Sequence, residues 1–146
     1  MDDVEIFIGQ SLEGPRVGDG FFIYVLQKKG TSNILVSNGD DKECTAHSLE
    51  INALIAALKR LRRPCRLEIH SAHGWLSQIH ANSWMGKWKE ADWKNSKGKE
   101  VANATQLREL SEIIEKGNHE IILMDHDLHS YTKWMEFEIE KRKKRA

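Results

Sequence analysis

The alternation of hydrophobic and polar residues predicts most of the regular elements of this chain. Five short runs rich in β-branched and aromatic residues are typical of strands, at 4–8, 21–27, 33–37, 67–71 and 120–124. A loop with four glycines, residues 9–20, separates the first two runs. A short turn at Gly30 separates the second run from the third, which is typical of a hairpin. We therefore expect the first three strands to be antiparallel.

Helical spacing of hydrophobic residues predicts a long helix over 45–62, which ends before Pro64. Further helices are predicted at 74–82, 103–116 and 131–145. We expect Asn103 to cap its helix with Gln106 as the capping-box partner, and the last helix to bury Trp134 and Met135. Because strand, helix and strand in succession imply a parallel crossover, the expected fold is α/β: a five-stranded mixed sheet flanked by helices, in one domain over 1–146.

Composition places the chain among globular proteins but shows an uneven distribution of charge. It has 146 residues, 40% of them hydrophobic, and 22 basic against 22 acidic residues. Basic residues concentrate at 84–99 and in the end of the last helix, 141–146, which favours an anionic partner. The two cysteines form no C-x-x-C pair, and no signal-peptide pattern or membrane-length apolar run occurs. We therefore expect a cytoplasmic monomer with no membrane contact.

Residues 84–99, WMGKWKEADWKNSKGK, interleave three tryptophans with five lysines. Lysines neutralise phosphates and indoles offer rigid apolar contact, so the segment is suited to a polyanion. An aromatic stripe at this spacing is also typical of a helix that buries its tryptophans and solvates its lysines. Spacing alone favours the buried stripe.

The order of elements, together with particular residues, resembles ribonuclease H of type 1 over about residues 4 to 142. The most specific part is Trp84-x-x-x-Trp88-x-x-x-x-Trp93-Lys94, which resembles the basic protrusion that grips an RNA/DNA hybrid in that family. We call residues 82–99 the handle. Thr45-x-x-x-x-Glu50 resembles the segment that carries a phosphate-contacting threonine and a metal-binding glutamate.

The resemblance implies a set of site residues. Catalytic positions fall on Glu50, Glu136 and His126, the last matching a mobile histidine that assists product release or proton transfer. Metal ligands fall on Glu50 and Glu136, with Mg²⁺ or Mn²⁺ as the expected ion, weakly held. The expected contacts to nucleic acid are Ser11, Thr45, Trp84, Lys87, Trp88, Trp93, Lys94, Lys97 and Asn103.

The family uses four carboxylates around two magnesium ions, which polarise the scissile phosphate and activate water, and this set is incomplete here. Gly9 and Ala72 stand where the family has aspartates, and Glu136 stands where aspartate is usual. Glu5 and Glu68 share strand faces with these positions but lie about 13 Å away along their strands, too far to replace them. Histidines 47, 70, 73 and 126, with Glu136, offer an alternative site selective for a transition metal.

Three functions follow as expectations. The first is binding of an RNA/DNA hybrid or related duplex through the handle, with cleavage lost or weakened. The second is an active, metal-dependent hybrid endoribonuclease that uses Glu50, Glu136 and stand-in ligands. The third is a protein-interaction module on the same fold, in which the tryptophans meet a partner protein.

Overall fold

The computed structural model describes residues 1–146 apart from 72–75, 79–82, 126–129 and 146, and apart from the side chains of Trp84 and Arg145. Its centre is a five-stranded sheet in the order β3-β2-β1-β4-β5. The strands are β1 (Asp2–Gln10), β2 (Gly18–Lys28), β3 (Ile34–Cys44), β4 (Cys65–Ser71) and β5 (Glu120–Asp125). β1, β2 and β3 pair antiparallel, whereas β4 pairs parallel with both β1 and β5. The predicted mixed sheet, with its first three strands antiparallel, is confirmed.

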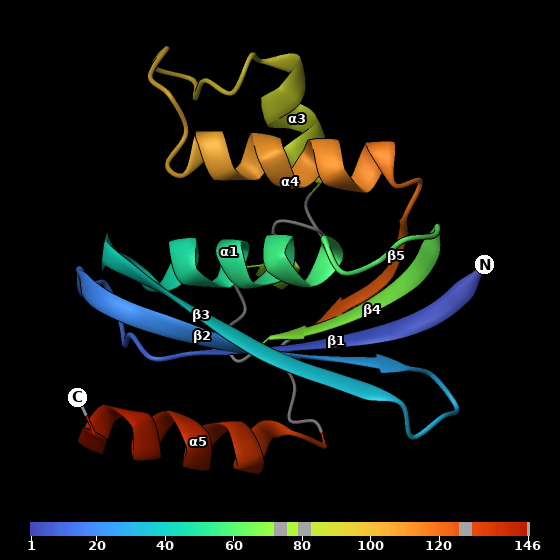
Figure 1. Ribbon diagram of the computed structural model, residues 1–146. Helices are drawn as coiled ribbons and strands as arrows, with labels where there is room; N and C mark the ends of the chain where they lie inside the picture. Colours follow the sequence, from blue (N-terminus) through green and yellow to red (C-terminus); the bar gives the residue numbers. More distant parts are fainter. Residues whose placement is uncertain (72–75, 79–82, 126–129, 146) are drawn as a thin grey trace.

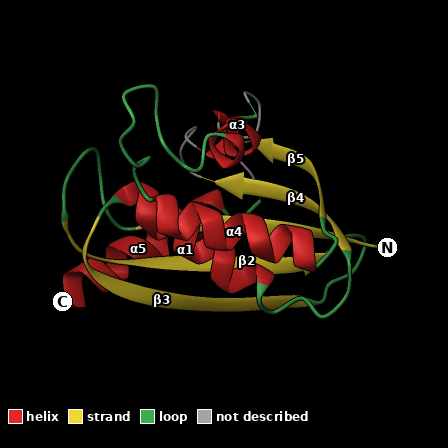
Figure 2. Cartoon of the chain, turned by 90° about the horizontal axis from the view of Figure 1, so that it is seen from above, coloured by secondary structure: helices red, strands yellow, loops and turns green. Residues whose placement is uncertain are grey.

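Helices cover both faces of this sheet (Figure 1). They are α1 (Ala46–Leu58), α3 (Trp84–Glu90), α4 (Ala104–Lys116) and α5 (Thr132–Arg145). α1 lies directly on one face, α4 lies over α1, and α5 lies alone on the opposite face. Seen from above, α3 lies on the β4–β5 side of the molecule (Figure 2). No helix in the described ranges is long and apolar enough to span a membrane.

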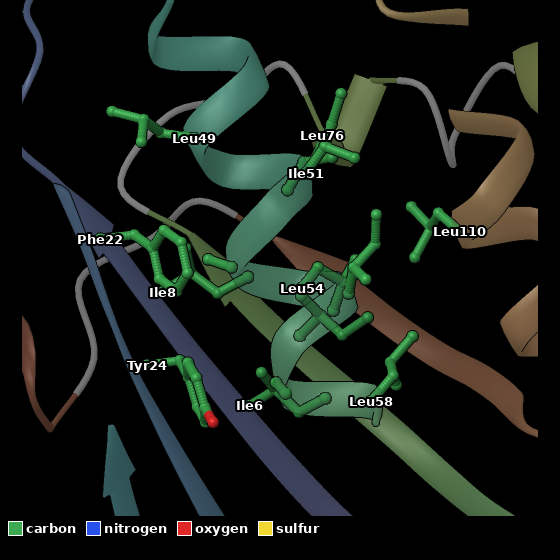
Figure 3. Packing of buried hydrophobic residues seen from close by; sticks show 14 of the residues in the cluster. Ile6, Ile8, Phe22, Tyr24, Leu49, Ile51, Leu54, Leu58, Leu76 and Leu110 are labelled. Atoms are coloured by element: carbon green, nitrogen blue, oxygen red, sulfur yellow. The ribbon is translucent and has the colours of Figure 1, made fainter. Parts of the chain in front are cut away.

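The alternation of side chains along β1 divides the core between the two faces. Ile6 and Ile8 point toward α1 and lie under Leu54 and Leu58 (Figure 3). Phe7 points the other way and packs with Ile23, Val25 and Met135, so that α5 covers a second, smaller cluster. Successive residues of a strand point to opposite faces, which is why this nearly continuous hydrophobic strand serves both layers.

Several boundaries differ from the predicted ones for reasons of hydrogen bonding. β3 continues through polar residues to Cys44 because its backbone pairs with β2 as far as Gly18. α1 ends at Leu58, before the predicted end at 62, because the following amides donate to the carbonyl three residues back instead of four. Arg60 donates to the carbonyl of Ala57, and Leu61 donates to that of Leu58. The predicted helix over 74–82 lies largely outside the described residues.

Two expectations about side chains are wrong. Asn103 adopts a left-handed conformation with φ +61° and its side chain does not cap α4, while Gln106 instead donates to the amide oxygen of Asn52. Trp134 is 39% exposed, although its neighbour Met135 is buried as expected. Successive helix residues are rotated by about 100°, so the stripe of α5 that contains Met135 and Ile139 faces the sheet and turns Trp134 toward solvent.

Candidate functional site

Glu50 is a buried carboxyl on α1. Thr45 caps the helix by accepting from the Ser48 amide, and the Ser48 hydroxyl accepts from the Thr45 amide in return. Glu50 follows within the next turn and is only 1% exposed. Neither of its carboxyl oxygens has a hydrogen-bond partner among the described residues. Burial raises the pKa of Glu50 from 4.5 to about 8.

Gly9 of β1 is buried against apolar side chains of α5. A Cβ at Gly9 would lie 3.2 Å from Met135 Sδ and 3.3 Å from Ile139 Cδ1. Glu136, the next residue of α5 after Met135, is exposed. Glu136 is thus exposed whereas Glu50 is buried, and an apolar side chain faces the position that has no carboxylate. His126 and Ala72 lie outside the described residues.

Two of the residues expected to contact nucleic acid meet in one cleft. Thr45 and Asn103 line a cavity of about 600 Å³ together with Gly14 and Pro15 of the β1–β2 loop. Ala46, His47 and Ala102 complete its lining. Ser11, three residues before Gly14 in the chain, is buried, and its hydroxyl accepts from the Phe21 amide at 2.9 Å. The cleft thus combines a hydroxyl and an amide side chain at the N-terminal end of α1.

Trp93 anchors the handle to the rest of the molecule. Its ring is 5% exposed and belongs to the main core, and the guanidinium of Arg108 lies 5.9 Å from the ring centroid. The Trp93 amide donates to the carbonyl of Trp88 at 2.6 Å, and the Val101 amide donates to the carbonyl of Trp93 at 2.9 Å. Trp88 is half-buried against the same core. Two tryptophans therefore pack inward, as the buried-stripe interpretation expects.

Asn95 organises the loop that follows Trp93. Its side-chain oxygen accepts from the amides of Lys97 and Lys99, at 2.9 and 3.1 Å, and its own amide donates to the Lys99 carbonyl at 2.7 Å. The backbones of Lys94 and Glu100 also pair in an isolated antiparallel β-bridge. The five lysines of the handle are all exposed, and within the described part of the chain only Lys89 forms an ion pair, with Glu115. The handle therefore has a packed aromatic base and an outward cationic surface.

The sequence model of the family RNase H matches residues 3–126. The chain belongs to the RNase H family. Ribonuclease H of Caldicellulosiruptor saccharolyticus is 30% identical over 101 residues, which is 69% of this chain and 68% of that protein. Ribonuclease H of Thermoanaerobacter sp. is 31% identical over 121 residues, which is 83% of this chain and 75% of that protein.

Solved structures of RNase H proteins share the fold. LC9-RNase H1, described as a type 1 RNase H with the type 2 active-site motif, superposes with a TM-score of 0.71 at 15% identity, covering 93% of this chain and 68% of that one. LC11-RNase H1 in complex with an RNA/DNA hybrid gives a TM-score of 0.66 at 16% identity, covering 96% and 99%. The likeness to type 1 RNase H, inferred from the sequence, is confirmed at the level of family and fold.

Within the part of the chain that the structure describes, the carboxyl groups of this RNase H family member do not fit a two-magnesium centre. Mg²⁺ takes oxygen ligands, and a pair of ions needs several carboxylates converging on one place. Among the described carboxyl groups, only Glu50 is buried with unsatisfied oxygens. Gly9 supplies none, Ala72 has no ligand atom, and Met135 rather than Glu136 faces Gly9.

Sequence reasoning missed the contact between Met135 and Gly9 and the role of Asn95. The resemblance implies a carboxylate at Glu136, ten residues after His126, whereas the rotation that sets Met135 against Gly9 follows from the packing of α5 on Phe7 and Ile23, which spacing does not reveal. Asn95 had a signal in the sequence: an asparagine followed by Ser-Lys-Gly is typical of a turn closed by the asparagine side chain.

Proposed function

We propose that this RNase H family member binds an RNA/DNA hybrid or a related duplex through the handle, with cleavage lost or severely weakened. The observation that supports this most directly is the construction of the handle. Trp93 is fixed in the core, so the exposed lysines around it are presented on an ordered support. Cations held in this way neutralise phosphates without first losing the freedom of a disordered segment.

The cleft between Thr45 and Asn103 supports a second point of contact with the same duplex. Hydroxyl and amide groups position a nucleic-acid backbone without reading its sequence, and these two side chains line the same cavity. LC11-RNase H1, which shares the fold, is a protein seen in complex with an RNA/DNA hybrid. Weak cleavage is expected because the described carboxyl groups do not assemble a pair of metal sites.

Binding is tested by fluorescence anisotropy with a labelled hybrid in EDTA, from low to moderate salt. Affinity should fall steeply with salt, and K87Q/K94Q should reduce the slope of log K against log salt by about 1 to 2. The matched control is K28Q/K59Q, which also removes two charges but at the far end of β2 and at the C-cap of α1, about 20 Å along α1 from Thr45. Salt-independent binding, or equal slopes for the two double variants, contradicts the proposal.

An active endoribonuclease is the second candidate, because the oxygens of Glu50 are buried and unsatisfied, a condition that a bound cation would relieve. A gel assay of the hybrid with Mg²⁺ or Mn²⁺ separates the two functions. Little or no cleavage supports the binding protein. Robust cleavage that disappears in E50A establishes the enzyme, whereas cleavage that survives E50A indicates a contaminating nuclease.

A further inference from the structure

Four titratable side chains gather on the side of β1, β4 and β5 that faces away from α1. Glu5 of β1 and Glu68 of β4 are direct partners in the parallel register, and His70 lies two residues further along β4 on the same face. Asp125 of β5 is the register partner of His70. The ligand atoms of Glu5, Glu68 and His70 all lie within 4.8 Å of one another. Three adjacent strands thus bring carboxylates and an imidazole to one place.

The orientation of His70 is fixed from two directions. Its Nδ1 lies 2.9 Å from Asp125 Oδ1, so the carboxylate accepts from the Nδ1 proton. Its ring stacks on Phe7 with 4.9 Å between the centroids and 13° between the planes. With the proton on Nδ1, the lone pair lies on Nε2, which is 3.7 Å from Glu5 Oε2. In metal sites, a ligating histidine often donates its other ring N–H to a carboxylate, which fixes the orientation of the ring.

The charges of this group favour a further cation. Lys29 Nζ lies 3.0 Å from Glu68 Oε1, and this contact raises the pKa of Lys29. Arg66 is engaged with Asp3 at 2.9 Å. Glu5, Glu68 and Asp125 bring three carboxylates to this group, and Lys29 contacts Glu68. Lys29 is half-exposed, so it can remain on one oxygen of Glu68 or move aside.

We propose that Glu5, Glu68 and His70 bind one divalent transition-metal ion, with Asp125 orienting the histidine. One imidazole and two carboxylates are donors that suit Zn²⁺, Mn²⁺ or Co²⁺ better than Mg²⁺, because imidazole is a poor ligand for hard cations. Three protein ligands leave positions open to water. His70 is 13% exposed and Glu5 is 26% exposed, so an ion can reach the group from solvent.

This site is separate from the position vacated at Gly9 and does not depend on duplex binding. Glu5 lies four residues before Gly9 on β1, about 13 Å at the rise of a strand. Glu50 lies on the helix that covers the opposite face of the sheet. An ion held here would join β1 to β4, the two parallel strands at the centre of the sheet.

Titration calorimetry with Zn²⁺ and the visible absorption of added Co²⁺ test the site on the whole chain after treatment with EDTA. Wild type should bind one ion, with a rise in Tm. E5Q and E68Q should each weaken binding at least tenfold, and H70Q should abolish saturable binding. D125N should weaken it about 10- to 100-fold, as loss of a ligand's supporting partner does. E112Q, a change at an exposed glutamate of α4, is the matched control and should bind as wild type does, and E50Q is measured beside it.

Far-UV circular dichroism in EDTA establishes that each variant is folded, and E5Q, a half-exposed surface change, decides the matter if H70Q does not fold. Absence of saturable binding to wild type overturns the proposal. Binding that is unchanged in E5Q and E68Q also overturns it, because the ion would then lie on other histidines. Binding that is lost only in E50Q would assign the ion to α1 and overturn it as well.

Discussion

Gly9 of β1 and Met135 of α5 lie against each other, and a Cβ on Gly9 would be 3.2 Å from Met135 Sδ. The side chain of residue 9 would therefore enter the apolar cluster of Phe7, Ile23, Val25 and Met135. The RNase H resemblance predicts an aspartate at residue 9, but side chains of α5 occupy the space that its side chain would need. A carboxylate at residue 9 would therefore meet apolar atoms of α5.

Gly9→Asp is expected to destabilise the protein by about 2 to 4 kcal/mol, because it buries a carboxylate among apolar side chains without a partner. Urea unfolding at pH 7 measures the free energy of unfolding. Gly9→Ala is the matched control: it adds only a Cβ against the flexible ends of Met135 and Ile139 and should cost about 1 kcal/mol or less. Equal stability of Gly9→Asp and wild type would show that the pocket admits water or charge.

The buried carboxyl of Glu50 predicts a fall in stability with rising pH. Its pKa is raised from 4.5 to about 8 in the folded protein, so the folded state favours the protonated form. Its contribution is complete below about pH 4.5 and is lost as pH rises toward 8, by a few kcal/mol at most. Glu50→Gln keeps the shape but cannot ionise, so it should be more stable than wild type at pH 8.

Thermal unfolding of both proteins in EDTA between pH 4.5 and 8.5 checks this prediction. Glu90→Gln, a change at an exposed glutamate of α3, is the control and should follow the wild-type pH profile. Parallel profiles for Glu50→Gln and wild type would mean that the Glu50 carboxyl is solvated and ionised in the folded state.

The tryptophans differ in their expected contribution to stability. Trp93→Ala should lower the free energy of unfolding by about 3 to 5 kcal/mol, because the indole is 5% exposed and belongs to the main core. Trp134→Ala removes a ring that is 39% exposed and should cost clearly less. Urea denaturation followed by circular dichroism compares the two, and a larger loss for Trp134→Ala would reverse the assignment of core and surface.

Asn95→Ala should weaken hybrid binding about threefold to tenfold without changing its dependence on salt. The variant keeps every lysine but removes the acceptor for the amides of Lys97 and Lys99, so the loop must be ordered on binding. Anisotropy titrations at several salt concentrations measure both quantities, and hydrogen exchange at Lys97 and Lys99 should accelerate. Ser96→Ala serves as the control, since the described contacts of the loop do not use its hydroxyl. A reduced salt slope for Asn95→Ala would indicate loss of an ionic contact instead.

The order of strands and helices follows from the sequence, because hydrophobic periodicity, glycines and Pro64 act over a few residues. The antiparallel hairpin and the parallel crossover were both accessible in this way. The handle and the family resemblance were also accessible, since they depend on residue types at fixed spacings. The end of β3 could not be predicted from the sequence, because hydrogen bonds to β2, not hydrophobicity, extend the strand to Cys44.

Contacts between distant segments could be identified only from the tertiary structure. Glu50 has the sequence context of an ordinary helix glutamate, and only the packing of α1 on the sheet buries it. Trp93 and Trp134 are equally hydrophobic, yet the turn after α3 places Trp93 in the core, whereas the rotation of α5 on the sheet turns Trp134 outward. Strand register brings Glu5, Glu68 and His70 together, and helix rotation sets Met135 rather than Glu136 against Gly9. Local spacing fixes which residues share a face; only packing decides what that face meets.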